Sequence, residues 1–256
     1  MTGNKCKIRL GGTARSLEHV ELLHSMGLQF AEITITDPST FSSVVPEYRN
    51  LKDRLGISYV CHGPREGDPN DLRQLENEYL PKVLGILALL TELEIPHLTL
   101  HLWLDPRFVK KESITFKLDL LGRIIREATG RGVLICLENL SETASHLSAP
   151  FGALPSLYLT LDLGHAQLLT EVNTSYEIIG RYPERIRHVH LHDNRGGHSA
   201  MDDLHLPPGE GIIDFEKIFG KLKEIDYDRT ISLELKPHEI ERCLEDVKAL
   251  LFRSGL

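Results

Sequence analysis

Short apolar runs alternate with longer amphipathic stretches along the whole chain. Eight of the runs are too short for helices and mostly lack strict alternation, so they predict strands buried on both faces. The expected strands are 5–10, 30–35, 57–61, 97–102, 132–139, 157–163, 185–193 and 230–236. The stretches between them show helical periodicity, most clearly at 16–26, 75–93, 114–129 and 214–225.

This alternation predicts a single α/β domain, residues 1–256, built as a (β/α)8 TIM barrel. Eight strand–helix units in 256 residues average about 32 residues each, which is typical of that fold. A doubly wound open sheet is the rival architecture, but it normally carries a glycine-rich phosphate-binding turn. Here only Gly11–Gly12 follows the first expected strand. No break in composition indicates a second domain.

Composition and charge indicate an ordinary globular protein. Hydrophobic residues make up 41% and charged residues 26% of the chain, and the formal net charge is −8. This acidic balance argues against a protein that coats nucleic acid or acidic membranes by general attraction. The four cysteines show no CxxC spacing, which suits a reducing compartment. The N-terminus lacks an apolar secretory segment, and the longest apolar run, 83–90, is far below the roughly 20 residues of a membrane span. We therefore expect a cytoplasmic protein.

Metal-capable side chains gather at the C-terminal ends of the expected strands, where barrel active sites lie. They are His62, His101, Glu138, Asp162, His165, His190, His192 and Glu234. A lone histidine at such a place is more often a hydrogen-bonded structural residue than a ligand. Glu138 and Glu234 are harder to explain in this way, because a carboxylate in an apolar strand is unfavourable unless it is paired or binds a metal. Carboxylates and imidazoles together favour zinc first and manganese second.

The densest polar segment is 188–211, HVHLHDNRGGHSAMDDLHLPPGEG, with five histidines and three aspartates. A solvated loop, one metal site or part of a larger cluster would each explain this composition. His188, His190 and His192 share one face of the expected strand, and we expect His188 to lie deeper and to be structural. The following loop would return Asp203 and His205 to the barrel mouth. The segment therefore predicts part of a site that carboxylates from other strands complete.

Seven short motifs occur in barrel order along the chain. They are HGP (62–64), LHL (100–102), LEN (137–139), LDLGHA (161–166), HVHLHDN (188–194), DLHLPPGEGIIDF (203–215) and LELK (233–236). Together they resemble the xylose-isomerase-like TIM-barrel superfamily, which includes sugar-phosphate isomerases and epimerases and the endonuclease IV branch. The resemblance covers about the whole chain.

The two branches imply different metal sites. In the epimerase-like branch, one divalent ion is held at the positions of Glu138, Asp162, His190 and Glu234, and the two glutamates form the acid/base pair. In the endonuclease IV branch, nine ligands hold three zinc ions. Those positions match His62, His101, Glu138, Asp162, His165, His190, Asp203, His205 and Glu234. The resemblance therefore implies one zinc or manganese ion for an isomerase and up to three zinc ions for an endonuclease.

Departures from the endonuclease pattern favour the sugar enzyme. Arg65–Glu66 stand where that branch has a tyrosine–leucine pair that enters DNA, and 35–41 lacks the basic and aromatic residues of a DNA-facing loop. We predict a divalent-metal-dependent sugar or sugar-phosphate isomerase or epimerase, in which Glu138 and Glu234 transfer a proton next to a carbonyl. The alternatives are a zinc-dependent apurinic/apyrimidinic endonuclease and a catalytically inactive metal- or sugar-binding barrel.

Four further side chains are candidates for contact with the substrate. His165 and His192 would touch the sugar, or would instead orient a neighbouring carboxylate. Arg195 would meet a phosphate or hydroxyl groups unless it belongs to a simple surface loop, and Trp103 would cover an apolar edge of the sugar unless it only packs. The expected partner is a small sugar molecule, with DNA only under the endonuclease reading, and we allow for a homo-oligomer.

Overall fold

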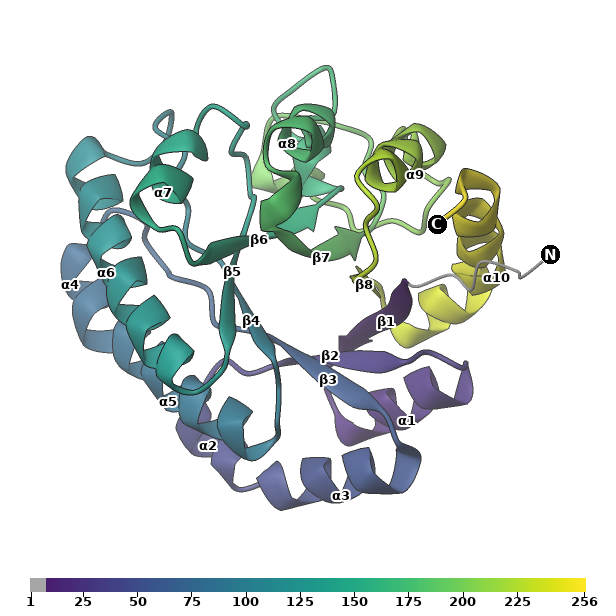
Figure 1. Cartoon of the computed structure of the whole chain (residues 1–256), viewed down its shortest axis with the longest axis horizontal. Helices are drawn as coiled ribbons and strands as arrows, with labels where there is room; N and C mark the ends of the chain where they lie inside the picture. The colour runs from purple at the N-terminus through teal and green to yellow at the C-terminus, as the bar shows by residue number, and fades with distance from the viewer. Residues whose placement is uncertain (1–7) are drawn as a thin grey trace.

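The computed structural model describes residues 8–256, which form a closed barrel of eight parallel strands (Figure 1). Each strand is hydrogen-bonded to the next, and β8 closes against β1. The strands are β1 (Arg9–Ala14), β2 (Phe30–Thr34), β3 (Ser58–His62), β4 (His97–Leu100), β5 (Leu134–Glu138), β6 (Leu157–Asp162), β7 (Ile186–Leu191) and β8 (Thr230–Leu233). The predicted (β/α)8 TIM barrel is confirmed.

Helices follow the strands and form the outer ring of the barrel (Figure 1). The longer elements are α1 (Leu17–Ser25), α3 (Val45–Leu55), α5 (Leu80–Glu92), α6 (Lys111–Gly130), α8 (Ser175–Arg181), α9 (Phe215–Glu224) and α10 (Pro237–Ser254). The short ones are α2 (Pro38–Ser42), α4 (Leu72–Gln74), the π-helical turn η1 (Leu75–Tyr79), α7 (Ser148–Ala153), and the 3₁₀ turns η2 (His165–Gln167), η3 (Pro183–Arg185) and η4 (Ala200–Asp202).

Local sequence explains where the predicted helices begin. The Ser16 hydroxyl accepts a hydrogen bond from the backbone N–H of His19 at the start of α1. The Asp214 carboxylate accepts one from Lys217 at the start of α9. Both satisfy amide groups that have no partner within the helix. The helices expected at 16–26, 114–129 and 214–225 are confirmed, and the one expected at 75–93 is divided into η1 and α5.

The first strand differs from its expected position. It spans Arg9–Ala14 rather than 5–10, and residues 5–7 lie outside the described part of the chain. Gly11 and Gly12 therefore lie within the strand instead of following it. A Cβ atom at Gly11 would overlap the Phe30 ring, and one at Gly12 would lie 2.6 Å from Ile240. Close packing requires glycine here, although its low strand propensity argued against a strand.

The inside of the barrel is polar, whereas the aliphatic core lies between strands and helices. Thr99 on β4 and Thr160 on β6 exchange a 2.8 Å hydrogen bond between strands that are not neighbours. Glu32 on β2 likewise contacts His188 on β7. Only side chains that point into the barrel can meet in this way, so the interior carries hydrogen-bonding groups up to the mouth.

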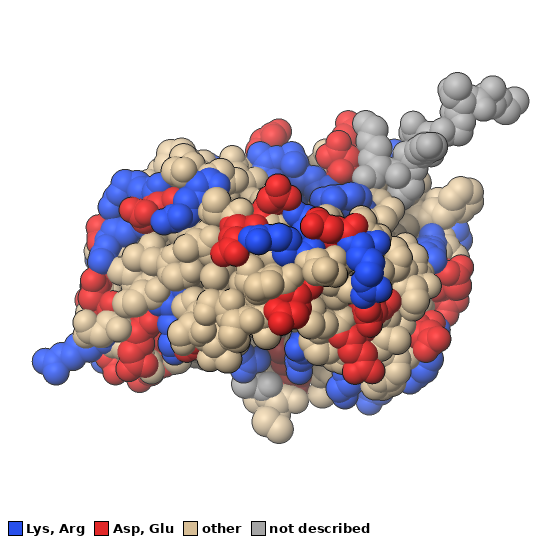
Figure 2. All heavy atoms as spheres, turned by 90° about the horizontal axis from the view of Figure 1, so that it is seen from below, with Lys and Arg blue, Asp and Glu red and all other residues tan. Residues whose placement is uncertain are grey.

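The described cysteines are buried free thiols, and charges are mixed on the surface. Cys61 and Cys136 lie in apolar strand runs, Cys243 is on α10, and Cys6 lies outside the described residues. Figure 2 shows acidic and basic side chains intermingled on one face, without a large area of one sign. Among the helices of residues 8–256, none combines the length and apolar character of a membrane span.

Candidate metal centre

The four ligands shared by both expected metal sites meet at the C-terminal mouth of the barrel. Glu138 and Asp162 end β5 and β6, His190 lies on β7, and Glu234 directly follows β8. His190 Nδ1 lies 3.3 Å from Glu234 Oε1, 3.5 Å from Glu138 Oε2 and 3.6 Å from Asp162 Oδ2. Glu138, Asp162 and His190 are fully buried, and the Glu234 side chain is 13% exposed. We call these four residues the central group.

The donor atoms of the central group fit a divalent cation. His190 Nδ1 is buried and has no hydrogen-bond partner among the described residues, although buried polar atoms are rarely left unpaired. Glu138 Oε1 is buried against His165 Nδ1, at 3.1 Å. Three carboxylates in contact with one imidazole would repel one another without a positive charge. Burial acts to raise the pKa of Glu138, but the nearby histidines, above all His101 and His190, lower that pKa well below its usual value.

A second group lies beside the first and shares Glu138 with it. His62 ends β3 and His101 directly follows β4. Their Nε2 atoms lie 3.1 and 2.8 Å from Glu138 Oε2, and 3.2 Å from each other. Burial lowers the pKa of His62, but its hydrogen bond to Glu138 raises that pKa to about 8. Glu138 Oε2 therefore faces His62 and His101 as well as His190 of the central group.

A third group is formed by His165, His192, Asp203 and His205. The Asp203 carboxylate accepts hydrogen bonds from His165 Nε2 at 3.3 Å and from His205 Nε2 at 3.2 Å. The His192 and His205 rings stack with centroids 3.9 Å apart. Burial acts to raise the pKa of Asp203, but hydrogen bonds from His165 and His205 lower it strongly. The loop after β7 thus returns Asp203 and His205 to the mouth, as the sequence predicts.

Four imidazoles at the mouth each have one nitrogen held by an acceptor of the protein itself. For His165 that nitrogen, Nδ1, also lies 3.1 Å from Glu138 Oε1. The Nδ1 atoms of His62, His165 and His205 donate to the backbone carbonyls of Gly63, Asn139 and Glu234, at 3.0, 3.2 and 3.1 Å. His190 Nε2 instead donates to a carboxylate, Glu32 Oε1, at 3.0 Å. Metal-binding histidines almost always have such a partner, which fixes the tautomer and leaves the other nitrogen for the ion. The three groups therefore bring all nine predicted ligand positions together at the mouth.

Asp162 is held in place by Asn139 and His192. The Asn139 side chain makes two hydrogen bonds of 2.9 Å to the backbone of Asp162. Its Nδ2 donates to the Asp162 carbonyl, and its Oδ1 accepts from the Asp162 N–H. His192 Nε2 lies 3.1 Å from Asp162 Oδ1, and its side chain is fully buried. Of the two roles expected for His192, this placement fits the orientation of a carboxylate rather than contact with a substrate.

Two carboxylates at the site were missed in the sequence. Glu32 is a buried carboxylate in the apolar strand FAEIT. The argument that singled out Glu138, a carboxylate in an apolar strand, would have found it as well. Asp193 accepts hydrogen bonds from the backbone N–H groups of Gly209, Gly211 and Ile213, at 2.9, 2.9 and 3.2 Å. It thereby fixes the end of the loop that carries Asp203 and His205. No local pattern distinguishes Asp193 from its polar neighbours.

The outer candidates lie around the mouth. Trp103 donates from Nε1 to the Ser141 hydroxyl at 2.7 Å and stacks on Phe108 with centroids 4.8 Å apart. Arg195 is exposed, and its Nε donates to the Glu210 carbonyl at 3.4 Å. Glu66, one of the pair that replaces the DNA-inserting residues, is buried against Lys117 with a 2.6 Å ion pair. It therefore cannot serve as a wedge.

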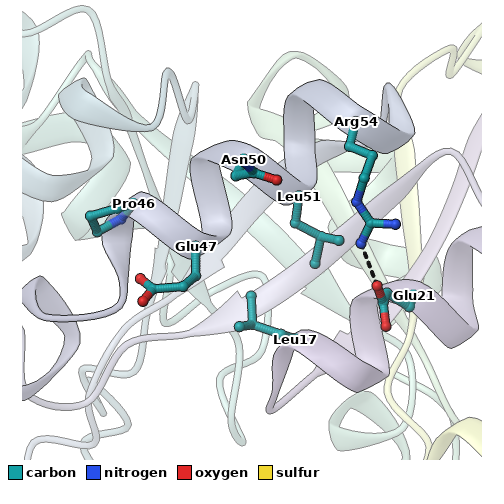
Figure 3. A pocket seen from close by; sticks show the side chains of 7 residues that line it. All are labelled: Leu17, Glu21, Pro46, Glu47, Asn50, Leu51 and Arg54. Carbon is teal, nitrogen blue, oxygen red and sulfur yellow. Dashed lines mark hydrogen bonds and ion pairs between the residues drawn. The ribbon is translucent and has the colours of Figure 1, made fainter.

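A groove of about 520 Å³ lies elsewhere, on the outer surface between α1 and α3 (Figure 3). It is lined by Leu17, Glu21, Pro46, Glu47, Asn50, Leu51 and Arg54. Arg54 and Glu21 form an ion pair across it. None of the residues of the three ligand groups lines this groove, so the candidate chemistry stays at the barrel mouth.

Comparison with known proteins agrees with the motifs. Residues 20–251 match the family described as xylose isomerase-like TIM barrel. The chain is 31% identical over 201 residues to the uncharacterized protein MJ1311 of Methanocaldococcus jannaschii, covering 73% of this chain and 67% of that protein. It is 34% identical over 93 residues to an inosose dehydratase of Geobacillus kaustophilus, covering 30% and 29%. A solved D-tagatose 3-epimerase-like protein shares the fold with a TM-score of 0.80 and 23% identity, covering 97% of this chain and 100% of that one. The chain belongs to the xylose isomerase-like TIM barrel family.

Proposed function

We propose that the protein is a divalent-metal-dependent isomerase or epimerase that acts on a sugar or sugar phosphate. The observation that carries this proposal is the central group, in which Glu138 and Glu234 lie 3.5 and 3.3 Å from the same atom, His190 Nδ1. The relatives support a small carbohydrate-like substrate, since they include an inosose dehydratase and a D-tagatose 3-epimerase-like protein. Cytoplasmic location, a single domain and a homo-oligomer stay predictions.

The two glutamates differ in solvent exposure, and this difference indicates a separate role for each in proton transfer. Glu138 is fully buried, whereas the Glu234 side chain is 13% exposed at the mouth. Glu138 ends β5 and Glu234 follows β8, and two strands separate β5 from β8, so the two side chains can approach a substrate from different directions. A divalent ion held here by Glu138, Asp162, His190 and Glu234 would supply charge stabilisation for a polarised carbonyl oxygen. Glu234 would then remove a proton from the neighbouring carbon, and Glu138, with a proton drawn from the hydrogen-bonded His62 Nε2, would return one.

Solvent exposure of the candidate side chains indicates which of them can contact a substrate. His165 is nearly buried, Trp103 is half-buried and Arg195 is exposed. We propose that His165 and Trp103 contact the sugar, and that Arg195 contacts a phosphate or hydroxyl group outside the ligand groups. His192 acts through Asp162 instead.

A second candidate function is phosphodiester hydrolysis at a multinuclear zinc centre, as in the endonuclease IV branch. The second and third groups favour it, because they complete the nine ligand positions of that branch. Contacts of Glu138 with His62 and His101 also compete with a role as a base towards carbon. The net charge of −8 and the buried Glu66 argue against duplex DNA as the substrate. A metal- or sugar-binding barrel without catalysis is the third reading, and the presence of both Glu138 and Glu234 argues against it.

Metal counting on the purified chain tests these candidates. An isomerase is expected to hold about one exchangeable Mn²⁺ or Co²⁺ per chain, and chelation should abolish turnover until the ion is restored. Inductively coupled plasma mass spectrometry gives the stoichiometry, and uptake of solvent deuterium into a panel of ketoses and ketose phosphates gives the activity. About three zinc ions per chain, with nicking of abasic duplex DNA, would instead establish the hydrolase.

A variant of the third group separates the same two readings. His205→Gln removes a ligand of the third group and keeps all four side chains of the central group, losing only the bond from His205 Nδ1 to the Glu234 backbone carbonyl. Deuterium exchange should survive this change if one central ion is sufficient, and cleavage of abasic DNA should be lost if three ions are needed. His238→Gln, on the first turn of α10, is the matched control because His238 belongs to none of the three groups.

A further inference from the structure

Glu32 is a carboxylate enclosed inside the barrel below the central group. It lies on β2, is 1% exposed, and reaches across the interior to β7. Its Oε1 accepts a hydrogen bond from His190 Nε2 at 3.0 Å, and its Oε2 accepts one from His188 Nε2 at 3.2 Å. The residue thus connects the polar interior to one ligand of the proposed metal centre.

The protons of this network can be assigned from its chemistry. An ionised carboxylate only accepts hydrogen bonds, so both imidazoles must donate to Glu32 from Nε2. The Nδ1 atom of His188 is then free to accept from the Thr230 hydroxyl, at 2.7 Å. When an ion is bound, the Nδ1 atom of His190 carries no proton, and its lone pair faces the three carboxylates of the central group. Every donor of the network therefore has an acceptor, and one nitrogen remains for the metal.

Glu32 differs from the partners of the other oriented histidines. His62, His165 and His205 donate to backbone carbonyls, whose position is set by the strands and loops themselves. His190 depends on a charged side chain from the far side of the barrel. A carboxylate partner makes an imidazole a more basic ligand than a carbonyl partner does. His190 is also the residue on which the three carboxylates of the central group converge.

We propose that Glu32 is a positioning residue that fixes the ring orientation and tautomer of His190, so that Nδ1 is the nitrogen that binds the metal. Glu32 does not touch the substrate or the ion. Thr230 and His188 form the supporting end of the same network and hold the second oxygen of Glu32. The inference rests on the metal-binding part of the proposed function and not on the identity of the sugar.

The test is the zinc affinity of Glu32→Gln, measured on the full chain by competition with a chromophoric chelator. Glutamine keeps the size of the side chain but loses its charge and cannot accept from both imidazoles. We expect zinc affinity to fall by about 10- to 100-fold, the usual effect of removing such a partner. Glu245→Gln is the matched control, since it makes the same change at an exposed position of α10 outside this network. Its zinc affinity should equal that of the unaltered protein.

A spectroscopic readout accompanies the affinity. In the zinc-loaded protein labelled with ¹⁵N-histidine, long-range ¹H–¹⁵N correlations should show His190 protonated at Nε2 and metal-bound through Nδ1, with His190→Gln identifying the signals. Zinc bound through Nε2, or equal zinc affinity in Glu32→Gln and the unaltered protein, would overturn the proposal. If Glu32→Gln does not fold, the His190 tautomer measured in the unaltered protein is by itself the test of the proposal. An unaltered protein that binds no zinc or manganese would instead defeat the proposed metal centre itself.

Discussion

Replacing Glu234 by glutamine is expected to lower turnover by about 10²- to 10⁴-fold while leaving the fold unchanged, because a positioned acid or base contributes about that much. Glu138→Gln should have an effect of the same order. The amide keeps the shape of each side chain but cannot accept a proton from carbon. Glu234 should tolerate the change well, since its side chain is partly open to solvent and, among the described residues, its ion-pair partners are His190 and His205 rather than Lys or Arg.

Three measurements make this result specific. Solvent-deuterium uptake into the substrate reports proton transfer, circular dichroism reports the fold, and metal content separates loss of the base from loss of the ligand. Glu245→Gln is the matched control, because Glu245 is exposed on α10 and pairs only with Lys248. Unchanged activity in both Glu138→Gln and Glu234→Gln would rule out the acid/base assignment. Lost activity with retained metal would support it most directly.

The Lys117→Met variant is expected to lose about 3–5 kcal/mol of unfolding free energy, the usual effect of removing one partner of a buried ion pair. Lys117 on α6 is fully buried, its Nζ lies 2.6 Å from Glu66 Oε2, and it donates to the Trp103 carbonyl at 2.8 Å. Methionine fills a similar volume but leaves the Glu66 carboxylate buried without a counter-charge. Burial already raises the pKa of Glu66, and Lys117 opposes that rise.

Urea denaturation of the variant measures this loss. Lys111→Met, at the exposed start of the same helix, should change the free energy of unfolding by less than about 0.5 kcal/mol. Adding Glu66→Gln to Lys117→Met should recover part of the loss, because the buried charge is then removed. A loss below about 1 kcal/mol for Lys117→Met would show that water or a rearrangement compensates the carboxylate. Glu66 also accepts a hydrogen bond from the Trp103 N–H. If Glu66 moves in Lys117→Met, the loop after His101 should therefore become more mobile.

The barrel could be predicted from local patterns because each strand carries its own signal. The runs 57–61, 157–163 and 185–193 are short and carry apolar residues, and stretches of helical periodicity separate the strands along the chain. The first strand was misplaced because its two glycines have low strand propensity. Their role depends on the Phe30 ring and on Ile240, which come from other parts of the chain.

The positions at the mouth could also be predicted, since parallel strands end at the same edge. His62, His101 and Glu138 were expected there, and the structure brings them within hydrogen-bonding distance. Glu32 was not recognised, because its role is visible only across the barrel. A strand pattern shows which face a side chain is on, but not which side chain stands opposite.

The sequence by itself determined the alternation of strands and helices, the edge at which the polar side chains gather, and the residue types available to a cation. These properties depend on neighbours along the chain, where periodicity and burial act directly. Only the tertiary structure decided how the ligands divide into three groups, which nitrogen of each oriented imidazole is held by an acceptor of the protein itself, and that Glu32 and Asp193 support the site. Those properties depend on closure of the barrel, which brings residues more than a hundred positions apart, such as Glu32 and His190, to a separation of 3.0 Å.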